Sequence, residues 1–423
     1  MNAPALIAIL CLAQPANALT LDDALARAAA HPRMTEVRAA AGQAAARVDE
    51  ARAGYLPSAT ALASYLPAQV GESSGRALLP DAVNPYYQAS IVVTQPIWDF
   101  GRTRGQVRAA TLAEDAVGSD LSAAAKDVEL QIRSAYYAAL ATEELLRVSE
   151  DAEKQMQAHL ALAKASLEVG RRTPFDVARA EVDVASARIA HIQAESALAA
   201  ARSALSAAVG EDIGQAALSR PAERAAEDLA PARAVEVALA QRPELGALDL
   251  RLSSQRAAVS AASSSFYPVV SAVGQVAWKG TDLPAASRTW QVGVLVSLPL
   301  LAGGGDAARL RQQEAAFAQL RSQREALALS IKTEAEQAAL AVSDARARQS
   351  ASEALLRQAN DNLRLAEGRY QAGVGGIIEL SDAQAALTSA RGQLVRAGYD
   401  LATARARLER AIGVPSAIGA AKG

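Results

Sequence analysis

The sequence predicts an α+β protein built from long antiparallel helices and four strands, in which one half of the chain duplicates the other. The first observation is a pair of similar interruptions, Gly170–Glu181 and Gly373–Gln384, each lying between two Ala-rich helical patterns. Their first residues lie 203 positions apart, and the same offset separates Gly210 from Gly413 and Pro96 from Pro299. The second observation is composition. Aromatic residues make up only 4% of the chain, as expected for helical bundles rather than for an aromatic-rich core.

The net charge and the few histidine and cysteine residues exclude several classes of function. The net charge of −2 is spread along the chain, so no basic surface for nucleic acid is predicted. The three histidines, His31, His159 and His191, have no metal-ligand spacing, and the single cysteine is Cys11. We therefore expect no enzyme, no metal site and no cofactor.

The N-terminus has the pattern of a secretory signal peptide, residues 1–18. Pro4–Leu12 is apolar, and Ala16-Asn17-Ala18 is a small-x-small cleavage site before Leu19. Leu10 precedes Cys11 where a lipoprotein site needs a small residue, so no lipid anchor is expected. The rest of the chain has no apolar stretch long enough for a transmembrane helix, so a membrane role would depend on strands.

The first predicted repeat covers residues 19–210. Tyr55-Leu56-Pro57 ends its first helix, because proline cannot continue a helix, and alternating runs then read as two strands. In order, we expect a helix at 21–53, strands at 58–65 and 86–95, a long helix at 103–169, a tip at 170–176 and a helix at 174–209.

The second predicted repeat covers residues 232–414, after a linker at 211–231 and before a mobile tail at 415–423. It should contain strands at 268–278 and 289–298, a long helix at 306–372, a tip at 373–379 and a helix at 377–412. A helix of 67 residues is about 100 Å long, so it has to coil against neighbouring helices.

The strands alternate between an apolar and a small-polar face, and the two copies agree on which face is apolar. Strands of about ten residues with one apolar face suit the wall of a membrane β-barrel. An antiparallel sheet with one face on a soluble core explains the alternation equally well. If the membrane reading holds, the lipid-facing residues are Val270, Val276, Trp278, Trp290, Val292, Val294 and Val296.

The two interruptions read as tight reversals between antiparallel helices. Gly170 ends one helix, and Thr173, Pro174 and Asp176 begin the next as N-cap, first helical residue and N3 acid. In the second copy Glu379 and Asp382 share one helix face. These acids either stabilise the helix start or, if the subunit is repeated around an axis, form a ring of charge.

These features together resemble the TolC-like outer-membrane efflux channel family. The resemblance rests on the duplication, on the strand ends Pro-Ile-Trp-Asp and Pro-Leu-Leu, and on the tip motifs VGRRTPFDVARAE and YQAGVGGIIELSDAQAAL. It implies a homotrimer in which each chain gives four strands to a twelve-stranded barrel in outer-membrane lipid. The helices would form a periplasmic α-barrel closed at the tip. It also implies partnership with a periplasmic adaptor and an inner-membrane pump of RND or ABC type.

The resemblance also implies site residues. Glu379 and Asp382 match acidic constriction positions, and Tyr370 and Asp176 match a tyrosine–aspartate link between the two helix pairs. Gly375 stands where the best-known member has a tip arginine. Arg179 is the first-repeat counterpart of Asp382 and could offset its charge. The exposed tip expected to meet the adaptor comprises Gly170, Arg171, Arg172, Gly373, Gly375 and Gly376.

The function predicted from the sequence is therefore an exit duct in the outer membrane of a Gram-negative bacterium. It would serve a tripartite efflux or type I secretion system as a passive channel gated at its periplasmic tip. The alternative is a periplasmic coiled-coil scaffold that forms no channel. A stand-alone porin is disfavoured because porins need no long helices. The cargo, whether drug, metal ion or polypeptide, is not encoded in a recognisable motif.

Overall fold

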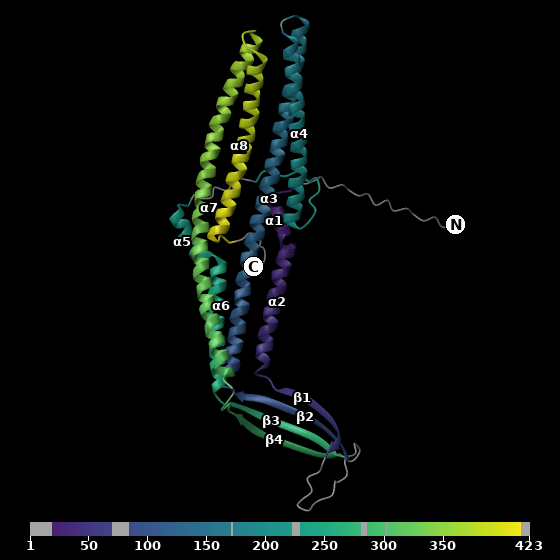
Figure 1. The fold of residues 1–423 in the computed structure, drawn as a ribbon, viewed down its shortest axis with the longest axis vertical. Coiled ribbons are helices and arrows are strands. Elements are labelled where there is room, and N and C mark those ends of the chain that lie inside the picture. Colours follow the sequence, from purple (N-terminus) through teal and green to yellow (C-terminus); the bar gives the residue numbers. More distant parts are fainter. Residues whose placement is uncertain are drawn as a thin grey trace, which may run out of the picture. The chain divides into compact units, whose positions relative to one another are not determined.

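The computed structural model describes residues 19–69, 84–170, 172–221, 229–280, 286–301 and 303–415. The predicted signal peptide, nearly all of the tail and part of the linker lie outside these residues. The elements in order are α1 (Leu21–Arg27), η1 (Ala28–Ala30), α2 (Pro32–Ala53), β1 (Ser58–Gln69), β2 (Asn84–Trp98), α3 (Arg102–Glu168), α4 (Pro174–Val209), α5 (Pro231–Gln241), α6 (Pro243–Ser263), η2 (Ser264–Phe266), β3 (Val269–Gly280), β4 (Ser287–Ser297), α7 (Gly305–Gln371) and α8 (Ile377–Ile412) (Figure 1).

The fold class predicted from the sequence is confirmed: the chain is mostly helical, with one four-stranded antiparallel sheet. The expected helix at 21–53 is divided at His31-Pro32 into α1, η1 and α2, because proline removes a backbone donor there. In the described part of the chain, no helix combines the length and hydrophobicity needed to cross a membrane. The chain divides into two compact units, described separately below.

The first unit comprises residues 1–37, 121–243 and 328–423 and contains two helical hairpins, α3 with α4 and α7 with α8 (Figure 1). In α7 the buried positions follow alternating steps of about four and three residues, which is the spacing of a coiled-coil seam. They are Ile331, Ala335, Ala339, Val342, Ala345, Ser352, Ala359, Leu363, Ala366 and Tyr370. The partner seam on α8 includes Ile377, Leu380, Ala383 and Leu387, so the two helices share one core.

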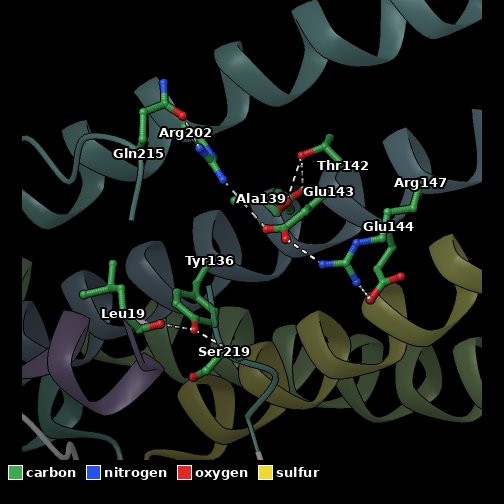
Figure 2. A network of polar contacts seen from close by, with 11 residues as sticks. Leu19, Tyr136, Ala139, Thr142, Glu143, Glu144, Arg147, Arg202, Gln215 and Ser219 are labelled. Atoms are coloured by element: carbon green, nitrogen blue, oxygen red, sulfur yellow. Dashed lines mark hydrogen bonds and ion pairs between the residues drawn. The ribbon is translucent and has the colours of Figure 1, made fainter. Parts of the chain in front are cut away.

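A second core in this unit joins the start of the described chain to the linker between the repeats. Leu19 pairs in parallel with Leu218, and the Leu19 carbonyl accepts from Ser219 N at 3.1 Å. The buried Tyr136 hydroxyl lies 2.8 Å from that carbonyl and 2.7 Å from the carbonyl of Ser219, as Figure 2 shows. Since a hydroxyl has one proton, it donates to one carbonyl at a time. A second group of contacts in Figure 2 centres on Arg202, which donates to Gln215 and forms an ion pair with Glu143.

The second unit comprises residues 38–120 and 244–327 and contains the sheet, in the order β1-β2-β3-β4. Every neighbouring pair is antiparallel, and β1 and β4 are the edges (Figure 1). The strands run a few residues beyond their predicted bounds, with a bulge in β2 between Pro96 and Trp98. The register aligns the two predicted apolar sets on one face, because Ile91 lies opposite Val276 and Val276 lies opposite Trp290.

No described part of the chain covers the β4 side of this apolar face. Val292 is 78% exposed and Trp290 is 71% exposed, and Val294 and Val296 are also exposed. On the other face, Ser90 and its partner Ala277 are buried. The sheet therefore has no apolar core of its own on the face that carries most of its large side chains.

Candidate gate at the two helix reversals

The first reversal forms as the sequence predicts. Gly170 has a φ of 73°, a left-handed conformation that ends α3. Thr173 is the N-cap of α4, with Pro174 following, and the Asp176 carboxylate accepts from Thr173 N at 2.9 Å and from Thr173 Oγ1 at 3.0 Å. The carboxylate of Asp176 is thus used to hold the start of its own helix.

The second reversal folds tightly onto the end of α7. Gly373 has a φ of 77°, and the amides of Val374 and Gly375 donate to the Arg369 carbonyl at 3.1 and 2.9 Å. A Cβ on Gly375 would lie 3.0 Å from Arg369 Cβ and 3.2 Å from Tyr370 N. A side chain at position 375 would therefore crowd the last turn of α7.

The structure shows no hydrogen bond between Tyr370 and Asp176, the two residues that match the tyrosine–aspartate link implied by the resemblance. Tyr370 is only 4% exposed, yet its hydroxyl has no hydrogen-bond partner among the described residues. The Asp176 carboxylate is engaged by Thr173 instead. Burial raises the pKa of Tyr370; Arg172 opposes this rise, and the negative charge of Asp176 adds to it.

The two reversals are joined by Arg172, which the sequence assigned to the adaptor-docking surface. Its guanidinium carbon lies 3.9 Å from the centre of the Tyr370 ring. It also donates to the carbonyls of Tyr370 at 2.6 Å and of Gly375 at 3.2 Å. A cation at the C-terminal end of a helix is favourable because the last carbonyls lack partners in the helix. Arg172 therefore caps α7 from the opposite hairpin.

The two predicted constriction acids have different surroundings. Glu379 forms an ion pair with Arg369 at 2.8 Å, with both side chains about half exposed. Asp382 has no ion pair with any described residue and lines a cavity of about 750 Å³ bounded by α3, α4 and α8. Arg179 lines the same cavity but pairs with Asp183, at 3.4 Å.

Two further polar contacts join the first hairpin to α8 near this cavity. Ser381 Oγ donates to Asp183 Oδ2 at 2.6 Å, and the amide of Gln384 donates to Gln155. The sequence analysis missed these contacts and also the Arg369–Glu379 pair. Polar residues inside the predicted α8 seam were the available signal, since a buried amide on a coiled-coil seam needs a partner.

The remaining predicted tip residues are Gly170, Gly373 and Gly376, where an added Cβ would meet nothing within 4 Å. Arg171 lies outside the described residues. Within the described part of the chain, no group of three or more His, Cys, Asp or Glu is placed to hold a metal ion. The described residues of the reversals offer hydrogen bonds, ion pairs and open backbone.

Sequence comparison finds related outer-membrane proteins. Over 361 residues, 82% of this chain and 71% of the relative, the chain is 26% identical to the probable efflux pump outer membrane protein TtgC of Pseudomonas putida. It is also 28% identical over 180 residues to outer membrane protein OprJ of Pseudomonas aeruginosa, and that match spans 41% of this chain but only 37% of OprJ.

Solved structures share the fold. The outer membrane protein VceC of Vibrio cholerae superposes with a TM-score of 0.80 at 21% identity, covering 93% of this chain and 96% of VceC. The CmeC outer membrane channel of Campylobacter jejuni gives 0.81 at 17% identity, covering 98% of this chain and 93% of CmeC. The profile of the outer membrane efflux protein family matches residues 21–211 and 234–414, both repeats, so the chain belongs to that family of passive efflux channels rather than to an enzyme family.

Proposed function

We propose that this chain forms, as a homotrimer, the exit duct of a tripartite efflux or type I secretion system in the outer membrane of a Gram-negative bacterium. The duct is passive, and its gate is the pair of helix reversals at the periplasmic tip. A periplasmic adaptor and an inner-membrane pump of RND or ABC type supply the energy and the cargo. The name of TtgC, an efflux pump outer membrane protein, favours efflux over secretion.

The observation that carries the proposal is the sheet. One face is apolar across the sheet, with exposed side chains on β2 and β4 and half-buried Val270 and Val276 on β3, and both β1 and β4 are edge strands of the described sheet. The unpaired backbone groups of an edge strand can hydrogen-bond to another strand, and a sheet that closes into a barrel has no edge strands. Three copies joined edge to edge make twelve strands, with the apolar face turned to lipid.

The helices supply a matching surface for a second copy. On α4, Phe175, Val182 and Ile189 are exposed at intervals of seven residues, and Ile192 is exposed beside them. An apolar stripe of this period is typical of a coiled-coil seam, and no described residue of this chain covers it. A neighbouring copy in the trimer covers it.

The proposed gate depends on the threefold symmetry of the trimer. Three copies bring Glu379 and Asp382 toward one axis, where their negative charges attract cations and repel anions. Arg369 offsets part of the charge of Glu379, so Asp382 contributes most to selectivity. The closed tip is held by Arg172, which stacks on the Tyr370 ring, and by the Asp183–Ser381 contact; the Tyr370 hydroxyl takes no part.

The test separates a lipid-facing sheet from a soluble scaffold. Arg introduced at Val294 is placed on the apolar face, whereas Arg at the adjacent Gly293 is placed on the opposite face, where a Cβ meets nothing within 4 Å. Val294→Arg should reduce outer-membrane insertion, at a cost of about 2–4 kcal/mol near the bilayer midplane. Gly293→Arg should insert normally. A parent protein that fractionates with soluble periplasmic protein would establish the scaffold instead.

A further inference from the structure

We propose that Arg288, between Trp278 and Trp290 on the apolar face of the sheet, binds the phosphate of a glycolipid headgroup in the outer leaflet of the membrane. The inference rests on the proposed function, because it requires the apolar face to be turned to lipid. Arg288 would give the apolar face one specific ligand site.

The register of the sheet builds the site. Arg288 on β4 lies directly opposite Trp278 on β3. Trp290 follows Arg288 by two residues, so both side chains leave the same face of β4. Both tryptophans are exposed, and Arg288 is exposed as well. A guanidinium thus lies among indole rings on an open surface.

The charge of Arg288 is isolated on this face. In the four described strands the only charged residues are Lys279 and Arg288. Lys279 follows Trp278 directly and therefore leaves the opposite face of β3. An arginine retained on an otherwise apolar lipid-facing surface needs an anionic partner or water within reach.

The position of Arg288 along the strand indicates which part of the membrane its guanidinium contacts. Trp98, Val270 and Val296 lie side by side on β2, β3 and β4, at the end of the sheet next to the helices. The aromatic Trp98 therefore marks that end of the apolar face. Arg288 is eight residues from Val296, which is about 27 Å along the strand. With a strand tilt of about 40°, this becomes a height of about 20 Å, close to the thickness of the apolar band of an outer-membrane barrel.

Arg288 therefore lies at the edge of the apolar band, at the end of the sheet away from the helices. With the helices in the periplasm, that edge is the outer leaflet. Further aromatic residues lie at the same edge. Tyr87 pairs with Gly280, two residues beyond Trp278, and the ring centres of Tyr87 and its β1 partner Tyr65 are 5.0 Å apart.

The chemistry of the site fits a phosphate. The planar guanidinium of arginine donates two parallel hydrogen bonds to phosphate oxygens, and the indole N–H of tryptophan donates from the membrane interface. The neighbouring Ala89 next to Trp278 leaves room for an acyl chain. A phosphorylated glycolipid of the outer leaflet supplies both the phosphate at this height and the chains below it.

The test measures lipid retention by native mass spectrometry of the purified trimer. The probes are bis-phosphorylated lipid A, lipid A stripped of phosphate, and phosphatidylglycerol. The variants are Arg288→Gln, Arg288→Lys and, as the matched control on the opposite face at the same height, Lys279→Gln. The parent should retain lipid A, Arg288→Gln should weaken retention at least fivefold, Arg288→Lys should be intermediate, and Lys279→Gln should match the parent.

Equal retention of lipid A by Arg288→Gln and the parent would overturn the site. Equal losses in Arg288→Gln and Lys279→Gln would overturn it too, because the effect would then be one of net charge. Equal retention of phosphatidylglycerol or of phosphate-free lipid A would contradict the assignment of the ligand. A parent protein that does not insert into bilayers refutes the proposed function itself, so the two failures are distinguishable.

Discussion

Arg172 is the side chain that joins the two helix reversals. It stacks on the Tyr370 ring and donates to the carbonyl of Tyr370, at the end of α7, and to the carbonyl of Gly375, in the second reversal. Tyr370 itself contributes a buried ring, while its hydroxyl has no hydrogen-bond partner among the described residues. A buried hydroxyl without a partner costs free energy, so Tyr370 stabilises the second reversal through its ring and not through its oxygen.

Two variants separate these roles. Tyr370→Phe removes only the unpartnered hydroxyl and should leave channel conductance unchanged and the tip as stable or slightly more stable. Arg172→Met keeps the length of the side chain but removes the cation and both hydrogen bonds. Since hydrogen bonds to a charged group contribute about 1.5–3 kcal/mol, this variant should raise the open probability in planar bilayers. A larger effect from Tyr370→Phe than from Arg172→Met would contradict this assignment.

At the scale of the elements, α3 and α4 are joined by a histidine whose charge depends on pH. His191 Nδ1 on α4 lies 2.6 Å from Glu153 Oε2 on α3, and Glu195 Oε1 lies 3.6 Å from His191 Nε2. The hydrogen bond with Glu153 raises the pKa of His191, and the charges of Glu195, Glu153 and Glu150 add to the rise. Lys164 pairs with Glu181 on the same two helices.

The sign of the pH effect follows from that direction. A histidine whose pKa is higher in the folded state than in the unfolded state stabilises the fold when it is protonated. This contribution is complete at a pH below the unfolded-state pKa of about 6.5, and it is lost as the pH rises through the folded-state pKa. His191→Gln should therefore lower the protection of α3 and α4 amides from hydrogen exchange at pH 6. At pH 9 the variant and parent should agree. A difference that stays constant between pH 6 and 9 would show that His191 acts by packing alone.

The elements themselves were largely predictable because each has a local cause. Proline and glycine set the ends of α4, which begins at Pro174 and stops before Gly210, and alternation gave the apolar face of β3 and β4. The contacts between hairpins were not predictable. Arg172 with Gly375 and Asp183 with Ser381 each join positions about 200 residues apart, and nothing in the local pattern specifies which polar side chains meet.

At the scale of the whole molecule, the α4 stripe predicts how copies assemble. Val182→Glu combined with Ile189→Glu would place charges in the seam that the second copy covers. Glutamate has good helix propensity, so α4 should persist while the trimer dissociates. The control is Glu195→Gln with Arg188→Gln, which changes polar α4 residues outside the stripe. The measurement is molar mass by light scattering in detergent; a trimer that survives the double substitution would exclude this stripe as the interface.

The central claim is that the chain forms a channel whose narrowest point carries the acids of the second reversal. The most direct measurement is single-channel recording of the purified protein in planar bilayers, for the parent and for Glu379→Gln with Asp382→Asn. We predict a cation-preferring channel that multivalent cations block, and a variant that conducts with weaker cation preference and weaker block. Conducting channels whose ion selectivity is identical in parent and variant would contradict the account, leaving these acids to stabilise the start of α8.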